Sequence, residues 1–232
     1  VTAQYVIKTY TVTFKDWDGT PLSTETVDHG SAATPPADPT RPGYTFTGWK
    51  DASTSVIYGA NDTLPAMIGA VVNYQAQWTL ETYKVNFVID ETTISDDYAY
   101  GADIAVPDET QTVKTGWTFK YWTDAQGNEV TPPTVMGDIG DNGASVTYTA
   151  YFEIDSHNAI FVSEGATVAT VPYNYGAAVS KPEDPKKTGW TFKGWKDAAG
   201  KLYGADEALP AMGTADVTYT AYFEINSYVA TF

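Results

Sequence analysis

The sequence has 232 residues and a formal net charge of −16, with 17 Tyr, 9 Phe and 7 Trp against 3 Met and no cysteine. The acidic balance argues against nucleic acid and anionic membranes as partners, because both require clustered Lys and Arg. The lack of cysteine excludes disulfides and thiolate metal sites. No apolar run reaches the roughly 18 residues of a membrane-spanning helix, so no membrane insertion is expected. The aromatic and β-branched content favours strands.

Internal repetition sets the organisation of the chain. The pattern Gly-aromatic-Thr-Phe-x-x-Trp occurs at residues 43–49, 116–122 and 189–195, so its final tryptophans recur every 73 residues. A His-Gly or Tyr-Gly pair precedes each copy of this pattern, and a Leu-Pro-Ala-Met segment follows it in the first and third copies. Repetition at a fixed period predicts tandem copies of one small domain.

Runs of alternating apolar residues open and close each copy, as expected of half-buried strands. In chain order, residues 1–8 predict the closing strand of a preceding repeat or a linker. Three full repeats are expected at residues 9–80, 81–155 and 156–226. Residues 227–232 predict the opening strand of a following repeat.

Each copy predicts two strands joined by a turn, a proline-rich connection, a third strand, a polar loop and a closing strand. The first turn of copy one reads Asp-Trp-Asp-Gly, which suits a positive φ at Gly19. Four prolines between Ser31 and Gly43 exclude a long helix in that connection. At most a single helical turn is expected there, near Ala32.

The aromatic residues of the third strand do not all fall on one face of a regular strand. Tyr44 and Phe46 share one face, and Trp49 falls on the opposite face unless Gly48 forms a β-bulge. Tyr121 takes the place of this glycine in the second copy, which argues against a required positive φ at this position.

The order of these landmarks resembles the Listeria–Bacteroides repeat, also called the internalin B-type repeat. In copy one the resemblance is carried by residues 10–14, Gly30, residues 37–49 and residues 74–78. Copy three repeats the pattern closely, and copy two departs most. The resemblance implies a β-grasp-like (ubiquitin-like) fold, and an extracellular location on the bacterial cell surface or cell wall. It implies no chemistry.

The linkers between copies, residues 79–82 and 153–156, contain neither Gly nor Pro. Short linkers of this kind leave little room for swivelling, so a semi-rigid, elongated rod is expected. The neighbouring repeats of the same chain are the expected packing partners, and the chain is expected to be monomeric.

Fifteen aromatic residues at repeated positions are predicted to form the core of the repeats. They are Phe14, Tyr44, Phe46, Trp49, Trp78, Phe87, Trp117, Phe119, Trp122, Phe152, Phe161, Trp190, Phe192, Trp195 and Phe223. Trp17 does not recur at its turn and is therefore the candidate for an exposed contact.

Neither histidine suggests catalysis. His29 aligns with tyrosines of the other copies, and so does His157, so half-buried rings are favoured over general bases. No catalytic motif is found, and no catalytic, cofactor-binding or metal-binding residue is assigned. Acidic residues at 16–18 and 138–142 could open calcium loops, but turn chemistry is favoured. A Lys15–Asn73 isopeptide crosslink is conceivable in copy one alone.

Two functions of different classes remain open. The first is a non-catalytic stalk or spacer that projects another domain from the cell surface. The alternative is an adhesive module that binds a host glycan, mucin or protein. The unusual features of Trp17 and of the long loop at residues 137–144 give slight support to the adhesive function.

Overall fold

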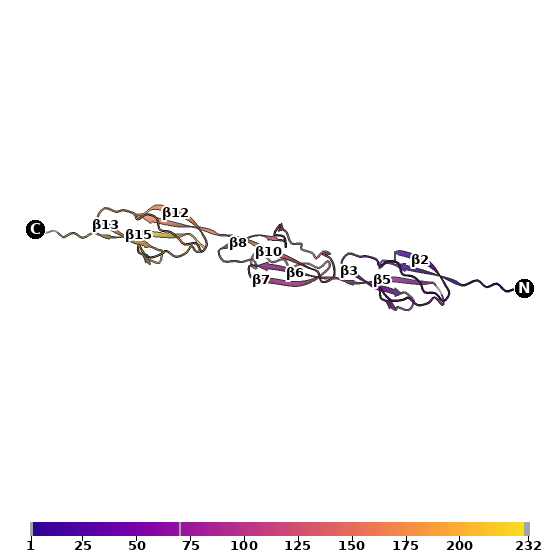
Figure 1. The fold of residues 1–232 in the computed structure, drawn as a ribbon. Coiled ribbons are helices and arrows are strands. Elements are labelled where there is room, and N and C mark those ends of the chain that lie inside the picture. Colours follow the sequence, from indigo (N-terminus) through magenta and orange to yellow (C-terminus); the bar gives the residue numbers. More distant parts are fainter. Residues whose placement is uncertain (1, 70, 230–232) are drawn as a thin grey trace. The chain divides into compact units, whose positions relative to one another are not determined.

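The computed structural model describes residues 2–69 and 71–229. Across these residues the fold is all β, with three similar five-stranded sheets and no helix. This confirms the prediction of a mainly β chain of tandem repeats. Each sheet takes up its own stretch of the sequence colours in Figure 1. None of the described segments forms a helix that is long and apolar enough to cross a membrane.

The strands follow the same order in all three sheets. The first sheet contains β1 (Thr9–Lys15), β2 (Pro21–Asp28), β3 (Tyr44–Asp51), β4 (Ile57–Tyr58) and β5 (Val72–Leu80). The second contains β6 (Thr82–Ile89), β7 (Thr92–Ala99), β8 (Trp117–Thr123), β9 (Glu129–Val130) and β10 (Ser145–Ile154). The third contains β11 (Ser156–Ser163), β12 (Ala166–Asn174), β13 (Trp190–Lys196), β14 (Leu202–Tyr203) and β15 (Val217–Ile225).

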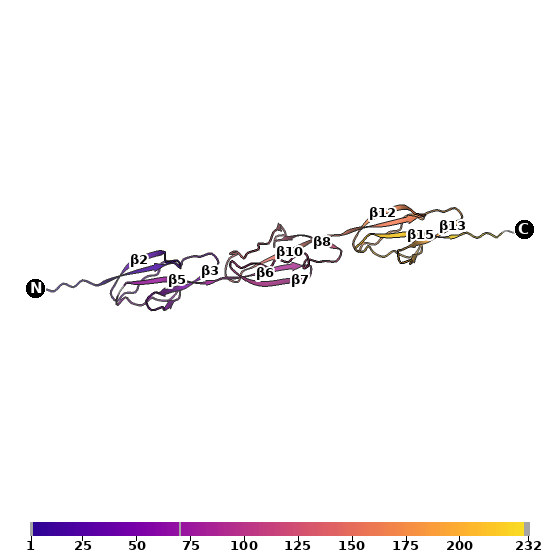
Figure 2. The ribbon, with the colours of Figure 1, turned by 180° about the vertical axis from the view of Figure 1, so that it is seen from behind.

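The first and last strands of a repeat lie side by side at the centre of its sheet. The order in the first sheet is β2-β1-β5-β3-β4, and β1 runs parallel to β5. The other pairs in this sheet are antiparallel. The third sheet repeats this arrangement, with β11 parallel to β15, and Figure 2 shows it from behind.

The parallel pair brings the core aromatics together. Val12 and Phe14 are fully buried because the alternation of β1 turns them to the same face. Phe14 stacks on Tyr74 of β5, with ring centroids 5.3 Å apart, and meets Trp49 of β3 edge-on at 4.9 Å. Phe161, Tyr219 and Trp195 form the same group in the third repeat.

A β-bulge in the third strand brings Trp49 into this core. The register of β3 against β5 shifts between Phe46 and Gly48, and Gly48 has a φ of 138°. The same shift occurs at Gly194, which has a φ of 142°. In the second repeat the bulge persists at Tyr121 without a positive φ. The conditional expectation of a bulge is therefore met, and the second repeat forms it without glycine, whereas Gly48 and Gly194 adopt a positive φ in the other two.

The connection between the second and third strands forms no helical turn at Ala32. Ala32 instead makes an antiparallel bridge to Ala66, and Gly30 N–H donates to the carbonyl of Met67 (2.7 Å). The pairing turns Met67 into the core, where it is 3% exposed. Extended backbone replaces the helical turn because this bridge satisfies its polar groups.

The backbone packs into two compact units. The first extends through Phe87 and adds Thr93–Val106 and Pro132–Tyr148. The second comprises Val88–Thr92, Pro107–Thr131 and the chain from Thr149 onward.

Residues 2–8 and 226–229 carry no strand. The expected alternation there also involves Val1, Ala230 and Phe232, which lie outside the described residues. The assignment of both segments to neighbouring repeats stays a prediction.

Candidate functional site

A tight turn precedes the third strand of every repeat. In the first repeat Tyr44 N–H donates to the carbonyl of Arg41 (3.1 Å), and the intervening Gly43 has a φ of 71°. A proline followed by a glycine of positive φ is typical of a type II turn. The turn recurs with Gly116 (φ 75°) and Gly189 (φ 78°) at the same position.

A tyrosine of the following repeat covers the first two of these glycines. A Cβ built on Gly43 would lie 2.1 Å from Cγ of Tyr100, so only glycine allows the ring to approach this closely. The Gly116 position meets the ring of Tyr175 at the same 2.1 Å. The Gly43 contact lies wholly within the first compact unit, and the Gly116 contact wholly within the second.

One linker residue joins the backbones at each contact. Glu81 N–H donates to the carbonyl of Gly43 (3.0 Å), and the Glu81 carbonyl accepts from Tyr100 N–H (3.0 Å). Asp155 makes the same two bonds, to Gly116 and Tyr175, both at 2.9 Å.

The side chain of the linker residue adds a further hydrogen bond. The hydroxyl of Thr45 donates to Oε1 of Glu81 (2.8 Å), and the hydroxyl of Thr118 donates to Oδ1 of Asp155 (2.6 Å). We call each set of glycine, threonine, linker residue and tyrosine a repeat junction: Gly43, Thr45, Glu81 and Tyr100 form the first, and Gly116, Thr118, Asp155 and Tyr175 the second.

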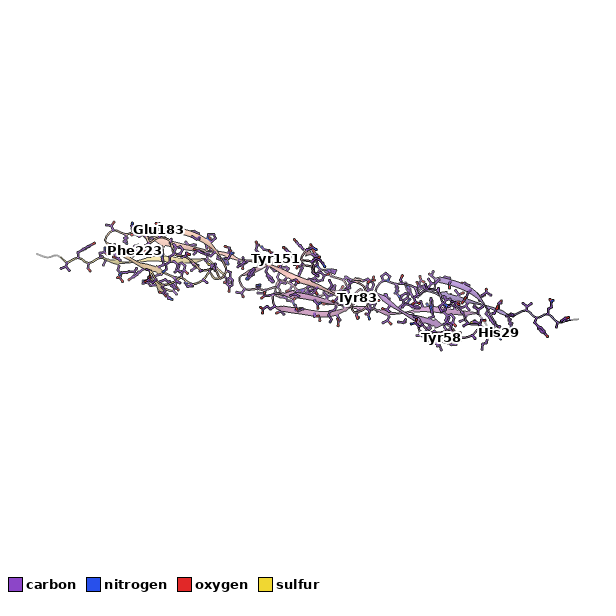
Figure 3. The ribbon with its side chains drawn as sticks, in the orientation of Figure 1. His29, Tyr58, Tyr83, Tyr151, Glu183 and Phe223 are labelled. Atoms are coloured by element: carbon purple, nitrogen blue, oxygen red, sulfur yellow. The ribbon has the colours of Figure 1, made fainter. Side chains whose placement is uncertain are left out.

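The first junction contains a buried carboxylate. Glu81 is 9% exposed, and the hydroxyl of the fully buried Tyr83 donates to its second oxygen. Burial raises the pKa of Tyr83 well above its usual range, and the hydrogen bond and negative charge of Glu81 raise it further. Figure 3 labels Tyr83 at the start of β6. Because the carboxylate accepts two hydroxyl donors, its burial is compensated.

The long loop of the second repeat packs onto this junction. Asp138 accepts hydrogen bonds from Gly140 N–H (3.0 Å) and from Gly43 N–H (3.3 Å). The bond from Gly140, then those from Gly43 and Tyr83, lower the pKa of Asp138 although partial desolvation opposes them. Asp138 also lines a hollow of about 450 Å³, together with Tyr44 and Trp78. The loop is thus built into a contact between repeats.

The acidic turns use their oxygens to hold backbone N–H groups. Asp18 accepts from Thr20 N–H (2.9 Å), and Asn142 accepts from Thr82 N–H (2.8 Å). In the described part of the chain, no group of three or more His, Asp or Glu side chains has an arrangement that could hold a metal ion. These contacts support turn chemistry in both loops.

Trp17 lies on the surface, 52% exposed. The guanidinium of Arg41 lies between two rings, 4.3 Å from the centroid of Trp17 and 3.6 Å from that of Tyr44. Lys114 and Lys187 take the place of Arg41 in the other repeats, each 4.6 Å from the ring of the following tryptophan. The sequence prediction gives this cation no role, although a cation recurs three residues before an aromatic residue in all three copies.

The fifteen predicted core aromatics divide into three groups by exposure. The buried ones are Phe14, Trp49, Phe87, Trp122, Phe161 and Trp195. The half-buried ones are Tyr44, Phe46, Trp78, Trp117, Phe119, Phe152, Phe192 and Phe223. Trp190 lies on the surface at 38% exposed, and a Cβ built on the glycine before it would meet no atom within 4 Å.

His29 is exposed, which corrects the expectation of a half-buried ring. Its ring hydrogen-bonds to the hydroxyl of Tyr10 (Nδ1 to Oη, 3.0 Å), and the backbone N–H of His29 donates to the carbonyl of Lys8 (2.8 Å). The backbone bond matches the one that Tyr100 makes to Glu81, but no glycine lies under the histidine ring. His157 is half-buried as expected.

The register of β1 against β5 does not pair the two residues of the conceivable isopeptide crosslink in copy one. Lys15 lies on β1 and Asn73 on the adjacent β5, but Lys15 is in register with Gln75 and Asn73 with Thr13.

The three sheets define a class of protein built from tandem all-β repeats. Residues 10–69, 83–139 and 157–222 match the Listeria-Bacteroides repeat domain. The chain therefore belongs to the Listeria-Bacteroides repeat family, which confirms the resemblance.

Longer proteins contain similar segments. A protein of Evansella cellulosilytica named as a Gly-rich membrane protein is 28% identical over 99% of this chain and 26% of its own length. A second protein of that organism, named as a membrane protein, is 28% identical over 83% of this chain and 28% of its own length. Internalin H of Listeria monocytogenes is 34% identical over 53% of this chain and 22% of its own length. The matched segments span about a quarter of these relatives.

Proposed function

We propose that this chain is a non-catalytic segment of a bacterial cell-surface protein and acts as a semi-rigid stalk. The observation that carries the proposal is the repeat junction, which links successive repeats twice with the same four kinds of contact. Membership of the repeat family and the names of the relatives, internalin and membrane proteins, support a location at the bacterial surface.

The proposal includes a β-grasp type for each repeat and a rod for the array. A central parallel pair of the first and last strands, flanked by the second and third, supports the β-grasp assignment. One residue, Glu81, separates β5 from β6, and one residue, Asp155, separates β10 from β11. Linkers this short, with their backbone groups bonded on both sides, restrict swivelling.

Spin labels test the stiffness directly. The chain lacks cysteine, so Thr26→Cys on β2 and Thr170→Cys on β12 place two labels at exposed positions of the first and third repeats. A stalk predicts one narrow distance distribution by electron spin resonance. Insertion of a Gly-Ser segment after Glu81 is the matched flexible control. A distribution in the native chain as broad as in this control would refute the stalk.

The exposed stack of Trp17 on Arg41 favours adhesion as the second candidate function, because exposed aromatic rings are suitable surfaces for sugars. Binding to mucins and glycans separates the two functions. Adhesion predicts saturable binding that Trp17→Ala abolishes and that Trp190→Ala, at another exposed tryptophan, leaves intact. A stalk predicts no binding by any of the three proteins.

A further inference from the structure

The third repeat carries one half of a repeat junction. Trp190 N–H donates to the carbonyl of Lys187 (3.0 Å) and closes the turn around Gly189. Asn226 N–H donates to the carbonyl of Gly189 (2.9 Å), and the hydroxyl of Thr191 donates to Oδ1 of Asn226 (2.6 Å). These are the bonds that Glu81 and Asp155 make with the turns of their own repeats. Asn226 thus occupies the position of a linker residue.

The other half of this junction is open. A Cβ built on Gly189 would meet no atom within 4 Å, whereas the equivalent glycines of the first two repeats lie under tyrosine rings and are buried. Trp190 is 38% exposed, and the equivalent Trp117 is half-buried. Trp190 begins β13, and Asn226 follows the last residue of β15; both strands are labelled in Figure 2.

We infer that the surface formed by Gly189, Trp190 and Asn226 is a docking face for the aromatic–glycine corner of a further copy of this repeat. The inference rests on the proposed stalk function and names the surface that would continue it. The corner is defined by Tyr100-Gly101 and by Tyr175-Gly176, in which the glycines have φ of 80° and 76°. Its ring covers the turn glycine, and its N–H donates to the carbonyl of the linker residue.

Two features favour this occupant over an unrelated apolar group. The glycine face is shaped for a flat ring, because it lacks a Cβ and lies beside a tryptophan. The carbonyl of Asn226 is positioned as an acceptor because its own N–H and side chain are already held by the turn. An aromatic residue with a free backbone N–H satisfies both features at once.

The test extends the full chain after Asn226 with a second copy of residues 82–155, so that an appended Tyr100 can reach Gly189. Hydrogen exchange is then followed in residues 187–192 and at Asn226. Docking predicts that exchange in both segments slows at least tenfold relative to the unextended chain. The appended Tyr100→Ala is expected to remove this protection.

Gly189→Ala provides the matched control. It removes the protection in the extended chain because its methyl group occupies the place of the ring, whereas in the unextended chain, where that space is open, it adds only the backbone strain of an alanine at a φ of 78°. Unchanged exchange next to a folded appended repeat, or protection that survives Gly189→Ala, would overturn the inference. A second extension with residues 156–229, which supplies Tyr175, serves if the first appended copy does not fold. The stalk is judged separately, by the width of the spin-label distances.

Discussion

Replacing Gly194 with alanine is expected to unfold the third repeat far more readily than the same change at Gly200. Gly194 sits in the bulge of β13 with a φ of 142°, and a Cβ there would lie 2.2 Å from the carbonyl oxygen of Tyr203. That oxygen belongs to the backbone of β14 and cannot move aside without breaking its strand. Gly200 also has a positive φ, 83°, but its Cβ would meet no atom within 4 Å.

The expected losses of stability at Gly194 and Gly200 differ in size for a physical reason. At Gly200 only the left-handed backbone is penalised, by about 1–2 kcal/mol. At Gly194 the rarer φ costs about 1–3 kcal/mol, and the overlap with the backbone adds about 1–3 kcal/mol. From the middle of these ranges, we expect Gly194→Ala to lower the free energy of unfolding by about 2 kcal/mol more than Gly200→Ala. In a domain of this size, that difference lowers the melting temperature by roughly 8–16 °C.

Hydrogen exchange during urea titration measures the effect repeat by repeat, since three similar repeats give overlapping transitions in bulk fluorescence. Exchange in β13 and β15 of Gly194→Ala should reach the rate of the unfolded chain at lower urea than in Gly200→Ala. The first repeat should be unaffected in both. Equal losses at the two glycines would refute the reasoning, because they would show that the bulge relaxes around a methyl group.

Three further predictions concern tyrosines. Tyr121→Gly removes a ring that stacks on the ring of Tyr151 on β10, with the two centroids 4.7 Å apart. Although this change installs the glycine of the other copies, we expect it to destabilise the second repeat by about 1–2 kcal/mol in thermal melts. A rise in melting temperature would contradict this. Tyr83→Phe leaves the buried Glu81 carboxylate with one hydrogen-bond donor fewer. We expect it to lower the free energy of unfolding, measured by urea titration, by about 1–3 kcal/mol. An unchanged free energy of unfolding would mean that water replaces the hydroxyl. Burial, then the charge of Asp51, raises the pKa of Tyr74 to about 12. An unfolded tyrosine ionises near pH 10, so folding favours the neutral form of Tyr74. The stability that the neutral Tyr74 contributes to the folded state is therefore complete below about pH 10 and is lost as the pH rises towards 12. Circular dichroism against pH, with Tyr74→Phe as the control, should show a smaller alkaline loss in the variant.

The local architecture could be predicted from the sequence. Alternation of apolar residues indicated the strands, because a half-buried strand exposes every second side chain. The strict recurrence of the Gly-aromatic-Thr-Phe pattern indicated three copies and the family. The spacing of Phe46 and Trp49 left a bulge at Gly48 as one of two alternatives, and the structure has the bulge. All of these features depend on residues close together in the sequence.

The tertiary structure alone decided which segments meet. The parallel pairing of β1 with β5 joins strands about 60 residues apart, and no local pattern encodes that register. Gly43 and Tyr100 were both recognised as parts of repeated landmarks, but only the fold places the ring of one repeat on the turn of another. The exposure of Trp190 could not be predicted for the same reason, since the burial of a side chain at this turn depends on residues that are distant in the sequence. A residue's own neighbours in sequence determine its strand and its face, whereas its partner across a junction is determined by long-range packing.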